Sequence, residues 1–475
     1  MESERTEPCR ISRRKAFPAL AAIPLVAQQA MRTTLAPAAE PDTPQKRESA
    51  DNALLDRFLR KGIRYFLENQ NRQGLVRDRQ NNWGSPESEE NAIYSISGTG
   101  MGMIVYGVAA QIGLLKKREA AERCNRMLAA AETLPQDHGM FPHFVRQKND
   151  VFVPTGHDTF STVDTSWLLA GAAYASQALE SQSIRDRAAM LLENADWRHW
   201  TAADESPEVT VHSSLICHGK DDAGRFLGNR VQGKWIPTTW DRLNSETSMM
   251  YVLAAGNGDG KNIDPHAWNQ LKLCTVHVGD RPVPSGDLGL FANQYGTLVI
   301  GATNPGPVNL DATAREAAIA NRKASKELGK IHPTFRRIWG LSAGMGPPNA
   351  WQEGEEQEEY RIYSPLETDG TAHPQATVAS VQHVRDLVLE NMQNAIRMES
   401  EGTYGLSTVN RDWRSQTVVA IDIAPAVLAI ANLRHGNIVR ETFSSHAHVR
   451  RGLSRLGFTE AEDRGNRAWT HRASS

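Results

Sequence analysis

Three acidic residues occupy positions where a carboxyl group is unusual. Asp164 and Glu246 each stand near the head of an apolar run with helical spacing, 166–171 and 249–256. Asp422 lies inside the apolar run 418–425. A carboxyl group at the start of an apolar helix either caps that helix or faces a cavity. A carboxyl group within an apolar run must be paired, protonated or functional.

Hydrolysis of a glycosidic bond is a reaction that such carboxyl groups could carry out. It needs a protonated acid at the leaving oxygen and a second carboxylate that acts as base or nucleophile. Apolar and aromatic neighbours raise the pKa of an acid, and Trp240 precedes Glu246 closely. Structural alternatives remain open for all three residues. Asp164 could be a helix cap, Glu246 a first-turn residue favoured by the helix dipole, and Asp422 a buried, paired carboxylate.

Further side chains could hold a sugar. The polar candidates are Arg77 and Asp78, which follow Gly74, and Asp158 on a loop. The aromatic and histidine candidates are Phe141, His143, Trp240, Tyr295 and Trp339. The alternatives are an ion pair of Asp78 with the flanking arginines, and core packing for the ring side chains.

Short segments spread over 385 residues share an order with a known family. They are 74–79, 97–102, 138–144, the Asp164 and Glu246 segments, 293–295, 320–322, 339–343, 421–425 and 456–458. In this order they resemble the glycoamylase-like domain family. That family includes bacterial endo-β-1,2-glucanases (glycoside hydrolase family 144) and the cyclisation domain of cyclic β-1,2-glucan synthases.

The resemblance implies an (α/α)6 toroid that acts on a β-glucan, with β-1,2 linkages favoured. It implies that Glu246 is the general acid and Asp422 the base of an inverting mechanism, and that Asp164 binds substrate or holds the catalytic water. In an inverting enzyme the two carboxyl groups stand roughly 6.5–9.5 Å apart.

The chain departs from the family at three places. Met345 replaces an Asp that usually follows the 339–343 segment, and the 405–410 segment lacks a further Asp. Ile423-Ala424-Pro425 stands where the family tends to Gln-Gly-Pro. These changes predict altered sugar contacts on a retained helical fold. Two other functions therefore stay open: a glycan-binding protein without catalysis and, less favoured, a polysaccharide lyase.

Helical periodicity recurs along most of the chain, and few segments have the pattern of strands. The expected helices are 51–68, 101–115, 118–134, 166–179, 184–200, 247–255, 311–327, 377–398, 417–434 and 446–456. This pattern predicts one all-α domain over 51–460, with two helical domains divided near residue 280 as the alternative. The long stretches 69–95, 135–165, 201–240, 276–306 and 329–376 are expected to be loops that surround a cleft.

Composition narrows the possible partners. The 475 residues carry a net charge of −2, which argues against a general nucleic-acid binder and leaves an oligo- or polysaccharide as the expected partner. Cys124, Cys217 and Cys274 form no disulfide framework, and no His or Cys spacing indicates a metal site. The glycines of 98–102 lack the spacing of a dinucleotide loop and suit close helix packing better. The sequence predicts no cofactor and no metal.

The amino terminus has the features of an export segment. Residues 1–30 contain the pair Arg13-Arg14 followed by a short apolar stretch, a pattern typical of a Tat signal. A Sec signal, or a chance basic start of a cytosolic protein, is the alternative. Residues 31–50 are expected to be a linker and 461–475 a polar tail. The sequence thus predicts a periplasmic or secreted protein without stable membrane insertion.

Overall fold

The structure is a computed structural model that describes residues 44–459 apart from 85, 87–91, 150, 157–158, 202–213, 232, 244–245, 280, 285–287, 303–308 and 349–357. The expected export segment, the tail 461–475 and Asp158 lie outside the described residues. The chain divides into two compact units, residues 1–54 and 55–475. Helix α1 (Pro44–Asn69) starts in the first unit, so residues 44–50 at the end of the expected linker are helical.

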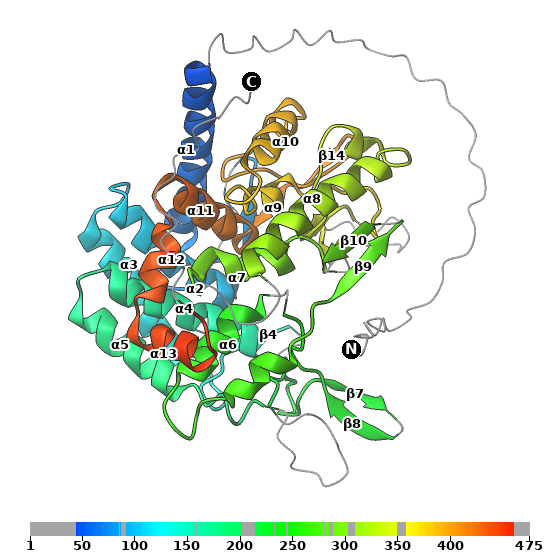
Figure 1. Cartoon of the computed structure of the whole chain (residues 1–475). Coiled ribbons are helices and arrows are strands. Elements are labelled where there is room, and N and C mark those ends of the chain that lie inside the picture. Colours follow the sequence, from blue (N-terminus) through cyan, green and yellow to red (C-terminus); the bar gives the residue numbers. More distant parts are fainter. Residues whose placement is uncertain are drawn as a thin grey trace. The chain divides into compact units, whose positions relative to one another are not determined.

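The described residues of the second unit are predominantly helical (Figure 1). The α-helices after α1 are α2 (Ile96–Gln111), α3 (Lys117–Thr133), α4 (Thr162–Ala178), α5 (Gln182–Asn194), α6 (Thr247–Gly256), α7 (Phe291–Val299), α8 (Leu310–Leu328), α9 (Pro374–Val378), α10 (Arg385–Arg397), α11 (Ala420–Arg434), α12 (Ile438–Ser444) and α13 (Ala447–Arg455). Two 3-10 helices, η1 (Pro265–Gln270) and η2 (Pro333–Arg336), complete the set. No described helix has both the length and the apolar character needed to cross a bilayer.

Six buried helices contact one another in a cycle. Helices α2, α4, α6 and α11 are buried on nearly all sides, and α7 and α9 are buried along most of their length. Helix α2 contacts α4, α4 contacts α6, and α6 contacts α7. Helix α9 contacts α11, which in turn contacts α2. The side chain of Gln294 on α7 closes the remaining step by donating to the carbonyl of Ala376 on α9 at 3.1 Å.

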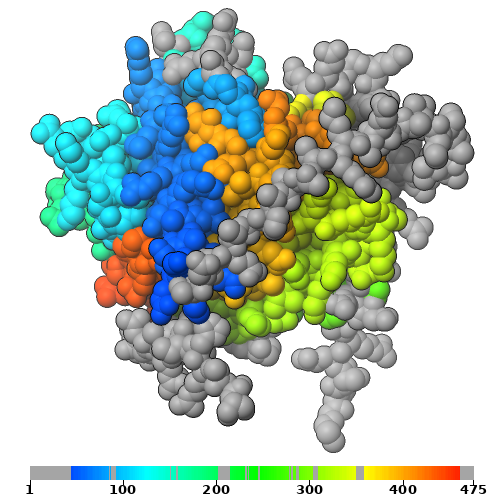
Figure 2. Space-filling view, turned by 90° about the horizontal axis from the view of Figure 1, so that it is seen from above, coloured from blue at the N-terminus to red at the C-terminus, as the bar shows by residue number. Residues whose placement is uncertain are grey.

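Amphipathic helices pack outside this cycle. Helices α3, α5, α8 and α10 each bury one face and contact the buried helix beside them in the chain. The described part of α1 that belongs to the second unit is attached to the segment near residue 400, where Glu401 forms ion pairs with Arg57 and Lys61 at 3.1 and 3.2 Å. Figure 2 shows these segments in blue and orange side by side.

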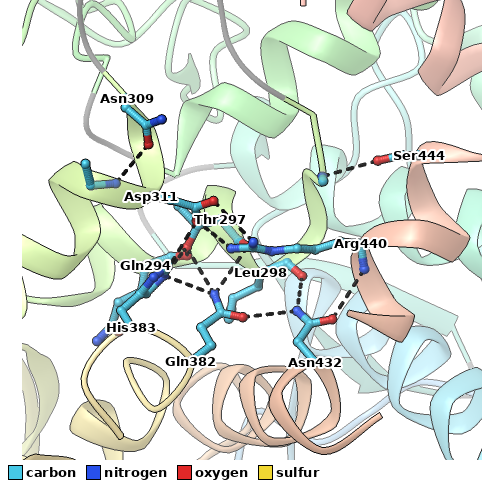
Figure 3. A network of polar contacts seen from close by, with 12 residues as sticks. Gln294, Thr297, Leu298, Asn309, Asp311, Gln382, His383, Asn432, Arg440 and Ser444 are labelled. Carbon is cyan, nitrogen blue, oxygen red and sulfur yellow. Dashed lines mark hydrogen bonds and ion pairs between the residues drawn. The ribbon is translucent and has the colours of Figure 1, made fainter. Parts of the chain in front are cut away.

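A polar network ties the buried helices to the carboxyl-terminal part of the unit (Figure 3). Arg440 on α12 pairs with Asp311 at the start of α8 through contacts of 2.6 and 3.2 Å, and it also donates to the carbonyl of Thr297 on α7. Asn432 on α11 donates to the carbonyl of Leu298 at 2.9 Å. These bonds give the buried polar groups partners in the interior, so they hold the helices in one arrangement.

Helices α2 and α4 approach each other so closely that glycine is required at the contact. A Cβ atom on Gly100 would lie 2.2 Å from the carbonyl oxygen of Trp167, and one on Gly171 would lie 2.1 Å from that of Gly100. The glycines of the 98–102 segment therefore serve helix packing, as the sequence indicated. This contact fixes the position of α4 relative to α2, and it therefore also fixes the position of Asp164 at the start of α4.

Short strands are more frequent than the sequence predicted. They are β1 (Arg79–Asn81), β2 (Ile93–Ser95), β3 (Phe144–Lys148), β4 (Val151–Thr155), β5 (Phe160–Ser161), β6 (Gly219–Lys220), β7 (Gly228–Val231), β8 (Lys234–Pro237), β9 (Thr275–Val278), β10 (Arg281–Pro284), β11 (Ala343–Gly346), β12 (Glu359–Ile362), β13 (Val409–Asn410), β14 (Trp413–Arg414) and β15 (Thr417–Val419). They form small antiparallel sheets of two or three strands. Strand pairing gives the backbone groups of the long loops their hydrogen-bond partners. A search for helical periodicity does not reveal such short strands.

The helix boundaries differ from the expected ones in a few places. The expected helix 377–398 is two helices, α9 and α10, because Val384 leaves helical geometry between them. The expected helix 184–200 ends at Asn194, where Ala195 is extended. Helices α7 and α12 were not anticipated, and each has fewer than ten residues.

We expect Gly100→Ala to destabilise the fold strongly. The new methyl group would meet backbone atoms of α4 that cannot move alone, so the free energy of unfolding should fall by about 3 kcal/mol. Gly258→Ala is the matched control, because the added atom there meets nothing within 4 Å. Thermal melting of both variants measures the effect, and equal melting temperatures would contradict the close contact of α2 and α4.

Candidate active site

The start of α4 holds the carboxyl group of Asp164 in a fixed orientation. Ser161 caps the helix, and its hydroxyl donates to Oδ2 of Asp164 at 2.5 Å, while the hydroxyl of Ser97 on α2 donates to Oδ1. The Nε2 atom of His143 lies 3.6 Å from the same Oδ1 atom. Asp164 is therefore not the cap of its helix, and its carboxyl group faces groups from two other segments.

Glu246 lies immediately before α6 and makes no capping hydrogen bond with its side chain. Burial first and the negative charge of Asp164 second raise the pKa of this carboxyl group, His143 acts in the opposite direction, and the net pKa is about 8. The indole N–H of Trp167 also opposes the rise, although it makes no hydrogen bond of regular geometry among the described residues. Glu246 thus holds its proton at neutral pH, as a general acid must.

Asp422 is the third residue of α11 and remains partly exposed. Burial raises its pKa well above the ordinary value, and the charge of Asp78 adds to the rise. The two carboxyl groups are brought together by backbone pairing: the N–H of Ala420 donates to the carbonyl of Asp78 at 2.7 Å, and Arg79 pairs with Val419 between β1 and β15. The start of α11 is therefore fixed beside Asp78.

Asp78 is itself buried and paired. Its Oδ2 atom accepts from Nε of Arg79 at 2.9 Å, and Nη2 of Arg79 lies at the same distance. Burial nevertheless raises the pKa of Asp78, and Arg79 and His143 offset only part of that rise. The expected arginine–aspartate ion pair exists, but the carboxylate lies in the interior and not on the surface.

Two tyrosines lie close enough to both Glu246 and Asp422 to interact with them electrostatically. The hydroxyl of Tyr295 on α7 donates to the carbonyl of Ile421 at 2.7 Å. Burial raises its pKa, and the charges of Asp422 and Glu246 both add to this effect. The pKa of Tyr360 on β12 is raised by burial first and then by Asp422, Tyr295, Asp78 and Glu246. Both hydroxyls are therefore within electrostatic reach of both carboxyl groups.

Tyr360 was not among the residues chosen from the sequence. It lies in the long stretch 329–376 and faces Met345 across the β11–β12 hairpin. The stretch was expected to be a loop beside a cleft, so the one available indication was its length. Tyr360 is placed by the pairing of β11 with β12, and such a pair of short strands has no periodic pattern in the sequence.

The other chosen residues divide between the site and its support. Trp240 stacks on His218 at 3.9 Å, and its indole N–H donates to Oγ1 of Thr162 at 3.1 Å, directly beside the start of α4. Phe141 is 1 % exposed, and its carbonyl accepts from the N–H of Ser161 at 2.9 Å, so it supports the Asp164 loop.

Two further residues predicted to bind sugar, Trp339 and Arg77, are buried. Trp339 is 5 % exposed and its indole N–H points to the carbonyl of Leu387 on α10, which favours the core-packing alternative. Arg77 is also buried, and its carbonyl accepts from the hydroxyl of Tyr65 at 2.9 Å.

A hollow opens beside Asp422 and brings the departures from the family pattern together. It is small, with a volume of about 20 Å³ that gives room for about one water molecule, and it opens to solvent. Its lining comprises Ala343, Met345, His373, Gln375, Ala376, Leu406, Thr408, Thr417, Val418, Val419 and Asp422. The hydroxyl of Thr408 donates to the carbonyl of Met345 at 2.6 Å, so the two altered segments are direct neighbours.

One group of side chains has the composition of a metal site. The ligand atoms of Asp137, His138 and His199 lie within 4.8 Å of one another. Nζ of Lys220 contacts Asp137 at 2.7 Å and Nε2 of His199 at 2.9 Å. It also lies 4.8 Å from the ring centres of Trp200 and Phe226. The ammonium group of Lys220 thus takes the position that a cation would occupy.

Comparison with solved structures defines the class of fold. A putative glucoamylase from Bacteroides caccae is similar over 86 % of this chain and 100 % of its own, with a TM-score of 0.70 and 21 % identity. The endo-β-1,2-glucanase of Chitinophaga pinensis, in complex with sophorotriose and glucose, matches 86 % of this chain and 98 % of its own, with a TM-score of 0.68 and 18 % identity. At these identities the likeness shows a shared fold.

A more distant structure extends the comparison. The endo-β-1,2-glucanase of Talaromyces funiculosus with sophorose covers 87 % of this chain and 91 % of its own, with a TM-score of 0.51 and 15 % identity. Residues 238–447 match the family model named Glycoamylase, described as putative glucoamylase. No curated protein matches the chain. The resemblance to the glycoamylase-like domain family is confirmed by the family model together with these structures.

We expect Glu246→Gln to stabilise the folded protein in a pH-dependent way. Folded Glu246 keeps its proton up to about pH 8, whereas the unfolded glutamate loses it near 4.5. Between these values the folded state binds more protons, so its stability falls as the pH rises, and a neutral glutamine escapes this loss. The variant should melt roughly 2–5 °C above the wild type at pH 8 and no higher at pH 4.5.

Thermal melting between pH 4.5 and 8 checks this expectation. Asp386→Asn is the control, since its side chain is 91 % exposed and its substitution should give no pH-dependent difference. A constant offset between Glu246→Gln and the wild type at all pH values would contradict the raised pKa of Glu246.

Proposed function

We propose that this chain is an exported glycoside hydrolase that cleaves a β-glucan, with β-1,2 linkages favoured, on an (α/α)6 toroid. The observation that carries the proposal is that Tyr295 and Tyr360 each lie within electrostatic reach of both Asp422 and Glu246, whose pKa is raised to about 8. The cycle of six buried helices supports the toroid. The names of structural neighbours support the substrate class, and residues 1–30 support export.

In the proposed reaction Glu246 donates its proton to the glycosidic oxygen as the bond to the anomeric carbon breaks. Asp422, in its ionised form, accepts a proton from a water molecule that attacks the anomeric carbon from the opposite face. The products are a sugar with an inverted anomeric centre and a free hydroxyl on the leaving chain. Asp164 contributes by its negative charge, which helps to keep Glu246 protonated, and its own orientation is set by Ser97 and Ser161.

The raised pKa of Asp422 places a condition on this mechanism. A general base must be ionised, so turnover should rise as the pH passes the pKa of Asp422 and fall as Glu246 loses its proton near pH 8. Burial and the charge of Asp78 raise the pKa of Asp422. Once ionised, Asp422 is therefore a stronger proton acceptor than an ordinary carboxylate.

A glycan-binding protein without catalysis is the second candidate. The observation in its favour is that Met345 and Thr408 meet beside Asp422, so uncharged groups border the base where the family pattern has acids. Such a protein would bind oligosaccharides but release no reducing ends, which an activity assay distinguishes directly.

We expect the purified mature chain to release reducing sugar from linear β-1,2-glucan. Glu246→Gln and Asp422→Asn should each lower kcat by about 10²–10⁴, because each removes one partner of the proton transfer. Asp386→Asn is the control and should keep full activity. Absence of release from every β-glucan tested would contradict hydrolysis, and full activity of Glu246→Gln would contradict its role as the acid.

We expect Asp78→Asn to move the acidic limb of the pH–rate profile to lower pH. Removing the charge of Asp78 lowers the pKa of Asp422, so the base is ionised at lower pH while the limb near pH 8 stays in place. The dependence of kcat/KM on pH measures both limbs. An acidic limb that stays fixed or moves upward would argue against Asp422 as the base.

A further inference from the structure

Lys220 at the end of β6 is a buried lysine, which is rare in proteins unless the charge is paired. It is 7 % exposed, and its Nζ atom donates to Oδ2 of Asp137 at 2.7 Å and to Nε2 of His199 at 2.9 Å. The rings of Trp200 and Phe226 enclose the same atom. A buried ion pair is weak evidence for stability, because the loss of hydration offsets the attraction between the charges. One use of such a pair is to fix a single arrangement of the segments that it joins.

The charge states of the partners suit these contacts. Burial acts to raise the pKa of Asp137, but hydrogen bonds with Lys220 and His138 outweigh it, so this pKa lies below its ordinary value. Burial first and the positive charge of Lys220 second lower the pKa of His199. At neutral pH Asp137 is therefore a carboxylate and His199 a neutral imidazole, and both accept hydrogen bonds from the ammonium group.

The ion pair joins the two segments that lie on either side of β5. Ser161 of β5 pairs with Phe141, whose carbonyl accepts from the N–H of Ser161 at 2.9 Å, and also with Gly219 of β6. Asp137 belongs to the backbone turn directly before Phe141, and Lys220 follows Gly219 in the chain. The contact between Lys220 and Asp137 therefore ties the two neighbours of Ser161 to each other.

Strands β5 and β6 lie so close together that they form one unit with the start of α4. A Cβ atom on Gly219 would lie 2.2 Å from the carbonyl oxygen of Phe160. The N–H of Thr162, the first residue of α4, donates to the carbonyl of His218 at 3.1 Å. A displacement of the segment that ends at Lys220 is therefore passed on directly to β5 and α4.

The position of Ser161 matters because its hydroxyl group orients Asp164. This hydroxyl donates to Oδ2 of Asp164 at 2.5 Å, and Ser161 caps α4. The groups that act on the carboxyl group of Glu246 besides burial are Asp164, which raises its pKa, and His143 and the indole N–H of Trp167, which lower it. The orientation of Asp164 therefore bears on the acid directly.

We propose that Lys220 is a positioning residue for the proposed acid, Glu246. Its ion pair with Asp137 holds Ser161 in place, and Ser161 in turn fixes the carboxyl group of Asp164. Without the ion pair Ser161 gains freedom, the carboxylate of Asp164 turns towards water, and water screens its charge from Glu246. The inference rests on the proposed function, in which Glu246 is the acid, and Lys220 acts through β5 and not by contact with the substrate.

Thermal melting without substrate tests this role. The quantity compared is the rise in melting temperature that Glu246→Gln causes at pH 8, measured in the wild-type and the Lys220→Met backgrounds. Lys220→Met keeps a long side chain and removes its charge. We expect the rise to fall to about half or less, because a weaker effect of Asp164 brings the pKa of Glu246 closer to its unfolded value and less stability is lost as the pH rises to 8.

Lys61→Met is the matched control. The side chain of Lys61 on α1 is 24 % exposed and forms an ion pair with Glu401 at 3.2 Å. Its substitution should lower the melting temperature equally with and without Glu246→Gln, so the rise should stay unchanged. A purely structural role for Lys220 would give this same result in Lys220→Met.

Two outcomes would overturn the inference: an unchanged rise in Lys220→Met, and the absence of any rise in the wild-type background. If Lys220→Met does not fold, Asp137→Asn removes the other charge of the pair and decides by the same criterion. Failure of the proposed function is a separate result, because it is seen as the absence of sugar release, whereas the melting comparison needs no turnover.

Discussion

The crowding of carboxyl groups is the constraint on which the rest of the site depends. Asp422, Asp78, Asp164 and Glu246 form a chain in which each charge disfavours ionisation of the next. This repulsion adds to burial in raising the pKa of Asp422, Asp78 and Glu246. The protein resolves this conflict by pairing Asp78 with Arg79, orienting Asp164 with two serine hydroxyls and leaving Glu246 protonated.

The scaffold explains why these groups meet although they are far apart in sequence. Asp164, Glu246 and Asp422 each lie at the amino-terminal end of a buried helix, and these helices belong to one cycle of contacts. The close glycine contact between α2 and α4 sets the position of Asp164. The pairing of β1 with β15 brings Asp78 to the start of α11. The helix ends position the three carboxyl groups, and the strand pairs between the helices form their surroundings.

The sequence allowed the helices and the main carboxyl groups to be predicted, because both depend on local patterns. Apolar runs with helical spacing located most helices, and an acidic residue at the head of such a run stands out without any tertiary information. Tyr360 could not be found in this way. It comes from a segment without regular periodicity, and its place near the carboxyl groups depends on residues distant in the chain. The short helices α7 and α12 were missed for a similar reason, since too few turns are available to show a period.

Two of the departures from the family pattern lie next to each other in the structure. In sequence Met345 and the 405–410 segment are separate irregularities, but in the structure they border the same hollow as Asp422. The changes therefore alter one side of the site together. Glu246 and Asp164 lie at the starts of other helices, α6 and α4.

The anomeric form of the first product tests the central claim most directly. Proton NMR recorded during early hydrolysis of β-1,2-glucan by the wild-type chain distinguishes the two anomers before they equilibrate. Attack of water activated by Asp422, opposite to a leaving group protonated by Glu246, predicts that the α-anomer appears first. The β-anomer as first product would contradict an inverting pair of Glu246 and Asp422.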